Sequence, residues 1–159
     1  MRKRKKISKQ VLSIEQMKHL KELGLNIERA SFLVHIDPLR DKYSESHIFN
    51  TSTPSSLFEY EVETFPVFSL QDLLSLLPKK ITVSENQCYG KGNFFLYIDY
   101  EYPEISYSVL DDWCPGLDEL NTVYINKDTE LIDAAYEMLC WCLENGYVEK
   151  DFEDYETKV

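Results

Sequence analysis

The chain lacks a long hydrophobic run: in its 159 residues no wholly apolar stretch is longer than six residues. A membrane-spanning helix needs about 20 consecutive apolar residues, so we do not expect an integral membrane protein. Residues 2–6 are all basic, but the mostly polar residues 7–11 that follow do not form the apolar core of a secretory signal peptide. We therefore expect a cytoplasmic protein.

Cysteine is also scarce, with four positions in the chain: Cys88, Cys114, Cys140 and Cys142. A chain of this length can bury about 68–70% of its unfolded surface, so it needs no disulfide framework and we expect reduced thiols. No metal site is expected, because Cys140 and Cys142 point about 160° apart on a predicted helix and the histidines lack ligand spacing. The histidines are His19, His35 and His47.

Motifs for phosphate binding and nucleophilic catalysis are absent as well. Residues 90–93 (GKGN) match only the end of a phosphate-binding loop and indicate a β-turn. No G-x-S-x-G motif occurs, so we assign no catalytic residue and no cofactor. Carboxylates are dense at Asp99 with Glu101 and in residues 111–119, but the Pro-Gly pair at 115–116 favours a solvated turn over an acid–base site.

Basic residues are few outside the N-terminal segment. Six of the 17 Lys and Arg residues lie within residues 2–9, which leaves 11 basic against 28 acidic residues, a net charge of −17. Such a body repels nucleic acid and attracts basic partners. Direct nucleic-acid binding is expected at most through the leader, and a disordered, solvated tail is the favoured interpretation of residues 1–12. The basic residues at the start of this leader are Arg2, Lys3, Arg4, Lys5 and Lys6.

Three segments carry helix signals. Residues 13–23 begin with a serine–glutamine capping box and residues 69–77 with a serine cap, and apolar residues recur on one side of each. Residues 129–145 have an acidic first turn and are followed by Gly146, a residue that commonly ends a helix. We predict a helix in each segment.

The stretches between these helices predict strands. The predicted strands are residues 30–36, 57–62, 81–83, 94–100, 105–110 and 121–125. Residues 94–98, apolar at every position, favour a central strand covered on both faces, and the aperiodic residues 37–56 indicate a mobile loop or a variable insertion. The whole pattern predicts one α+β domain over residues 13–159, with an antiparallel-rich sheet of about five or six strands and three helices packed on it.

The last predicted helix has an acidic stripe beside a wide apolar face. The stripe consists of Glu130, Asp133, Glu137 and Glu144. Trp141 lies about 40° from Glu137, so a large ring is placed at the border of the stripe. Either the chain after Gly146 folds over this ring, or a second molecule covers it. We take Trp141, Glu137 and Glu144 as the candidate protein interface and favour a partner with a basic surface.

Three phrases of the sequence resemble a known group of proteins. They are LSIEQMKHL at 12–20 running into ELGL at 22–25, FSLQDLL at 68–74 with LPK at 77–79, and IDAAYEMLCWC at 132–142 continuing to residue 147. Together they resemble a family of small acidic proteins from gut Bacteroidales genomes, often in phage-like or mobile regions, without an assigned function. The resemblance implies a bacterial or phage cytoplasmic setting and transfers no catalytic residue.

Three hypotheses of function follow from these patterns. The first is a non-enzymatic protein-binding or regulatory protein of a phage or mobile element. The second is an acidic mimic of nucleic-acid charge that inhibits a DNA-handling host protein. The third is a carboxylate-based hydrolase that uses Asp99 with Asp111 or Asp112. The sequence favours the first.

Overall fold

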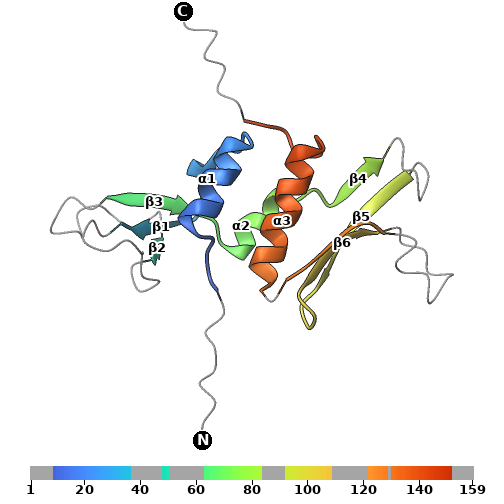
Figure 1. Cartoon of the computed structure of the whole chain (residues 1–159), viewed down its shortest axis with the longest axis horizontal. Coiled ribbons are helices and arrows are strands. Elements are labelled where there is room, and N and C mark those ends of the chain that lie inside the picture. Colours follow the sequence, from blue (N-terminus) through green and yellow to red (C-terminus); the bar gives the residue numbers. More distant parts are fainter. Residues whose placement is uncertain are drawn as a thin grey trace, which may run out of the picture.

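Three α-helices lie between a three-stranded and a four-stranded antiparallel sheet (Figure 1) in the part of the chain that the structure describes. The structure is a computed structural model that describes residues 9–36, 48–50, 63–83, 92–108, 122–128 and 130–151. The elements are α1 (Ile14–Glu22), η1 (Ile27–Arg29), β1 (Phe32–His35), β2 (Ile48–Asn50), β3 (Thr64–Val67), α2 (Leu70–Leu76), β4 (Lys80–Val83), β5 (Gly92–Asp99), β6 (Glu104–Ser108), β7 (Thr122–Lys127) and α3 (Leu131–Glu144). The predicted α+β class with three helices is confirmed.

The first two helices begin with the same local device. At α1, the Ser13 hydroxyl accepts the N–H of Gln16, and the Gln16 side chain accepts the N–H of Ser13. At α2, Ser69 and Asp72 form the same reciprocal pair. Each box satisfies N–H groups that a helix start leaves without intrahelical partners. The sequence predicted both starts because the capping side chains are adjacent in sequence to the groups they satisfy.

The residues that precede α1 belong to the core. Val11 is 2% exposed and Leu12 is fully buried, and the N–H of Leu12 donates to the carbonyl of Phe68 just before α2. This hydrogen bond and the pairing of Val11 with Ser69 join the starts of α1 and α2. The predicted domain boundary at residue 12 is therefore corrected: the domain includes residues 9–12.

Lys9 ties the same segment to α3. Its Nζ lies 2.6 Å from Asp133 Oδ1, and the Gln16 side chain donates to the same carboxylate oxygen at 3.0 Å. Both charged side chains are about three-quarters covered, so the pair is better shielded from solvent than a surface ion pair. The first basic residues of the leader lie outside the described residues.

The smaller sheet has the order β2-β1-β3. Its strand β3 contains Pro66, which has no N–H to donate and is tolerated because β3 is an edge strand. Strand β2 lies inside residues 37–56, so the mobile-loop alternative is wrong for residues 48–50, which pair with β1. The strand predicted at 57–62 lies outside the described residues.

The larger sheet has the order β4-β5-β6-β7, and every neighbouring pair is antiparallel. One face packs against α3 and carries the buried side chains of Phe94, Ile105 and Tyr107. The sequence did not predict that the strands divide between two sheets. Among the described strands, β1 to β3 pair with one another, and β4 to β7 form the second sheet.

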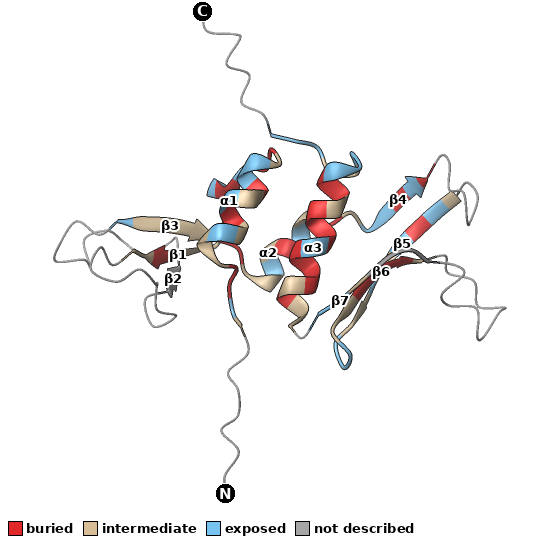
Figure 2. Ribbon diagram, in the orientation of Figure 1, coloured by how far each residue is buried: buried red, intermediate tan, exposed pale blue. Residues whose placement is uncertain are grey.

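Helix α3 is the central element of the core. Figure 2 shows it buried along most of its length, between α1 and α2 on one side and the larger sheet on the other. Its buried residues are Ile132, Ala134, Ala135, Tyr136, Met138, Leu139, Cys140, Cys142 and Leu143. A helix that is apolar over most of its circumference is expected to be enclosed on more than one side, as observed.

Candidate functional site

The most exposed large apolar side chains among the described residues all belong to the hairpin of β5 and β6. Phe95 is 37% exposed, Tyr97 51%, and Tyr100 and Tyr102 69% each. Phe95 and Tyr97 are two residues apart on β5, so they share the face of the sheet that points away from α3. The prediction that residues 94–98 are covered on both faces is therefore wrong. We name these four side chains the aromatic surface.

Small polar side chains surround the aromatic surface on the same sheet face. The Thr82 hydroxyl donates to the side-chain oxygen of Asn93 at 2.9 Å, and the hydroxyls of Ser106 and Ser108 lie 3.3 Å apart. The antiparallel register places Ser106 opposite Tyr97. Thr82 and Asn93 are exposed and Ser108 is partly covered, whereas Ser106 is buried. The face therefore combines aromatic rings with a few accessible hydroxyl and amide groups, and it differs in composition from the apolar face that contacts α3.

Asp99 fixes the turn that presents the two most exposed tyrosines. Its Oδ1 accepts the N–H groups of Glu101 at 2.9 Å and of Tyr102 at 3.1 Å. Such side-chain capping holds a turn that otherwise leaves backbone donors unpaired. The Asp99 and Glu101 pair noted in the sequence is thus explained in part by turn geometry. The acidic residues at 111–119 lie outside the described residues.

The candidate interface on α3 has neighbours within the chain. The ring centroid of Trp141 lies 5.3 Å from that of Tyr147 and 6.2 Å from that of Tyr107, which is fully buried. Trp141 is partly buried and packs against the core. Glu137 and Glu144 are exposed. The first residues after α3 therefore cover one side of the tryptophan, as the internal alternative predicted.

The acidic stripe of α3 is interrupted at its first turn. Asp133 is engaged by Lys9 and Gln16, so it contributes to the α1–α3 contact rather than to an open anionic surface. Glu130 is partly covered and forms the N-cap of α3 without a side-chain hydrogen bond. The exposed part of the predicted stripe consists of Glu137 and Glu144.

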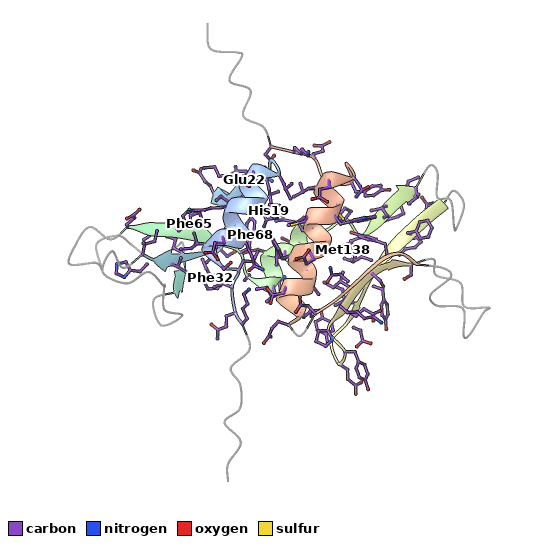
Figure 3. The ribbon with its side chains drawn as sticks, in the orientation of Figure 1. His19, Glu22, Phe32, Phe65, Phe68 and Met138 are labelled. Carbon is purple, nitrogen blue, oxygen red and sulfur yellow. The ribbon has the colours of Figure 1, made fainter. Side chains whose placement is uncertain are left out.

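A histidine, a tyrosine and a cysteine meet where α1 contacts α3. Figure 3 shows His19 on the side of α1 that faces α3. Its Nδ1 lies 2.5 Å from the hydroxyl of Tyr136 and 3.8 Å from Sγ of Cys140. Sequence spacing gave no signal for this cluster, because more than 100 residues separate His19 from the other two.

The cluster contains the thiol and imidazole of a catalytic cysteine–histidine pair, but the pKa of its thiol is raised rather than lowered. Burial raises the pKa of the Cys140 thiol to about 12, and the carboxylates of Glu137 and Glu144 also raise it, while the hydrogen bond with Tyr136 acts in the opposite direction. A nucleophilic cysteine needs a lowered pKa. Cys140 is therefore a neutral thiol over the physiological pH range, and the contact packs α1 against α3.

Cys142 is buried on the other side of α3, next to the larger sheet. Its thiol lies 3.7 Å from the hydroxyl of Tyr107, which donates to the carbonyl of Pro78 at 2.7 Å. Burial raises the pKa of Cys142 to about 11 and the pKa of the Tyr107 hydroxyl above its usual range. Cys140 and Cys142 are both unbridged, whereas Cys88 and Cys114 lie outside the described residues. Within the described ranges, no three His, Cys, Asp or Glu side chains are grouped to hold a metal ion.

The two buried thiols predict a loss of stability at high pH. An unfolded cysteine has a pKa of about 8.5, below the folded values of about 12 and 11, so the folded state resists ionisation. Their contribution to stability is fully present below about pH 8.5 and is lost as the pH rises through the folded values. Urea unfolding from pH 8 to 11 should show this decline. The decline in stability should be smaller in the C140A/C142A double variant than in the wild type. An equal decline in both proteins would show that the two thiols are not its cause.

No described helix is both long and apolar enough to cross a membrane. Comparisons with family models, with curated proteins and with solved structures gave no match.

Proposed function

We propose that this protein is a non-enzymatic binding protein that recognises a protein partner through the aromatic surface of the β5–β6 hairpin. The observation that carries the proposal is the exposure of Phe95, Tyr97, Tyr100 and Tyr102 on one hairpin. Large apolar patches on a soluble surface are costly to keep uncovered and commonly mark interaction sites. A phage or mobile-element setting is part of the proposal and rests on the sequence resemblance alone.

The composition of the face supports a protein partner. Antibody paratopes combine tyrosines with serine and asparagine, because tyrosine offers a large rigid contact area at low entropic cost and small polar groups adapt their hydrogen bonds. The exposed Asn93 and the partly covered Ser108 lie on the same face as Tyr97, whereas Ser106 on that face is buried. Aromatic residues also dominate the binding energy at interface centres.

The cluster of His19, Tyr136 and Cys140 gives no support to a thiol-based enzymatic role. Cys140 beside His19 is protonated, and its hydrogen-bonding groups face one another inside the α1–α3 contact. Asp99, the carboxylate of the hydrolase hypothesis that the structure describes, accepts two backbone N–H groups of its own turn. The contact of Cys140 with His19 is thus explained by helix packing, and the position of the Asp99 carboxylate is explained by its turn.

Affinity capture from the native host tests the proposal. The wild-type chain is compared with the F95S/Y97S variant, and the captured proteins are quantified by mass spectrometry. Loss of both rings should lower capture of the specific partner by at least about tenfold, since each hot-spot ring contributes roughly 1 kcal/mol or more. Both side chains are partly exposed, so the variant is expected to fold, which circular dichroism verifies.

A matched control comes from the opposite side of the molecule. Lys18 and Glu22 are exposed on α1, and the K18S/E22S variant changes two surface side chains without touching the hairpin. The proposal expects this control to capture the partner as well as the wild type does. Equal capture by all three proteins would refute the assignment of the surface.

A further inference from the structure

We infer that the hairpin end, residues 99–104, binds an arginine side chain of the partner, an inference that rests on the proposed function and specifies its ligand chemistry. The hairpin end presents Tyr100 and Tyr102 at 69% exposure with the exposed Glu101 between them in sequence. The remaining charges of this segment are the carboxylates of Asp99 and Glu104. Figure 2 shows the turn as an exposed projection from the sheet.

Aromatic rings and carboxylates together favour a cation. The face of a tyrosine ring attracts a cation through its quadrupole, and a neighbouring carboxylate adds direct charge attraction. No described basic side chain forms an ion pair with Glu101, whereas Lys127 lies 3.4 Å from Glu104. Glu101 is therefore the carboxylate at the hairpin end that is left to meet a basic partner, and the strongly acidic body adds long-range attraction.

The lysines near the aromatic surface differ in whether a carboxylate balances their charge. Lys80 pairs in register with Phe95, at the opposite end of the aromatic surface from the turn, and forms no ion pair with a described carboxylate. Lys127 lies near the turn, but its Nζ is 3.4 Å from Oε2 of Glu104, so that charge is balanced. A cation is therefore disfavoured beside Phe95 and less so beside Tyr100 and Tyr102. In this arrangement Phe95 and Tyr97 contact apolar parts of the partner, and the hairpin end selects its charge.

Arginine is favoured over lysine for a physical reason. The guanidinium group is planar and weakly hydrated, so it stacks on a tyrosine ring and still donates to a carboxylate, whereas the lysine ammonium is a strongly hydrated point charge. General attraction to an acidic protein does not distinguish the two residues, because both carry one positive charge. Preference for arginine is thus a signature of the ring contacts.

The test measures binding of a labelled arginine–serine peptide and of its lysine–serine counterpart to the full chain by fluorescence polarisation. The arginine peptide should bind about threefold or more tightly than the lysine peptide. The Y100S/Y102S variant should bind the arginine peptide about tenfold more weakly and lose the preference. Glu101→Gln should weaken binding about threefold, whereas Glu22→Gln, with the same loss of charge on α1, should have little effect.

Three outcomes would overturn the inference: equal affinity for both peptides, equal effects of Glu101→Gln and Glu22→Gln, or no binding of the arginine peptide to the wild type. Each is distinguishable from failure of the proposed function. If the peptide result is negative but capture of the partner still depends on Phe95 and Tyr97, the proposed function stands and only the arginine inference fails. Conversely, arginine selection at the hairpin end with no dependence of capture on Phe95 and Tyr97 would refute only the proposed function.

Discussion

Replacing Trp141 with alanine is expected to lower the free energy of unfolding by about 3 kcal/mol and to leave the association state unchanged. The indole lies between the rings of Tyr107 and Tyr147 and packs against the core. Its removal deletes both ring contacts and leaves space between α3, β6 and the chain after α3. Chemical denaturation measures the first effect and light scattering the second.

The same variant decides whether Trp141 belongs to an intermolecular interface. If Trp141 with Glu137 and Glu144 binds a partner, Trp141→Ala should change stability only mildly and should shift the association equilibrium. A matched control is E137Q/E144Q, which removes the exposed charges of α3 and leaves the rings in place. Loss of association in both variants, with little change in stability, would contradict the internal role of the tryptophan.

Leu12→Ala is expected to cost about 3 kcal/mol of stability. Leu12 is fully buried, and its N–H bonds to the carbonyl of Phe68, which is itself 1% exposed. Truncation leaves a cavity where the starts of α1 and α2 meet. Thermal and urea unfolding measure the effect.

Deletion of residues 2–6 is the contrasting experiment. These residues repel one another and bring no apolar side chain, so the melting temperature should stay nearly unchanged. A deletion that costs as much stability as Leu12→Ala would place the domain boundary before residue 9. A Leu12→Ala variant as stable as the wild type would contradict the packing of residues 9–12.

The helices were predictable because their signals are local. Ser13 and Gln16 are three residues apart, as are Ser69 and Asp72, and each pair satisfies groups within one turn. The end of α3 followed from Gly146, which adopts a positive φ of 76°. The structure bears out these helices to within two residues at each end.

The pairing of strands was not predictable because it depends on distant segments. Strand β3 contains Pro66, which argues against a strand unless the strand is known to lie at an edge. Strand β2 is three residues long and gives no periodic signal. Figure 1 shows the three helices between the sheet of β1–β3 and the sheet of β4–β7, and no local pattern encodes that separation.

The aromatic surface was missed for a related reason. Residues 94–98 are apolar on both faces, and this pattern is typical of a strand enclosed on both sides. In the folded chain α3 covers the face of Phe94, while Phe95 and Tyr97 remain exposed. A pattern that predicts burial on both faces can therefore also occur in a strand with one exposed face, when no described residues cover that face.

The most direct test of the binding surface is site-specific photocrosslinking in the native host. A photoreactive benzoylphenylalanine replaces Tyr97 in one chain and Glu22, exposed on α1, in another. We predict that illumination links the chain labelled at position 97 to a discrete partner protein and that the chain labelled at position 22 gives no such product. Absence of a product at position 97, or the same products at both positions, would contradict a protein-binding role for this face.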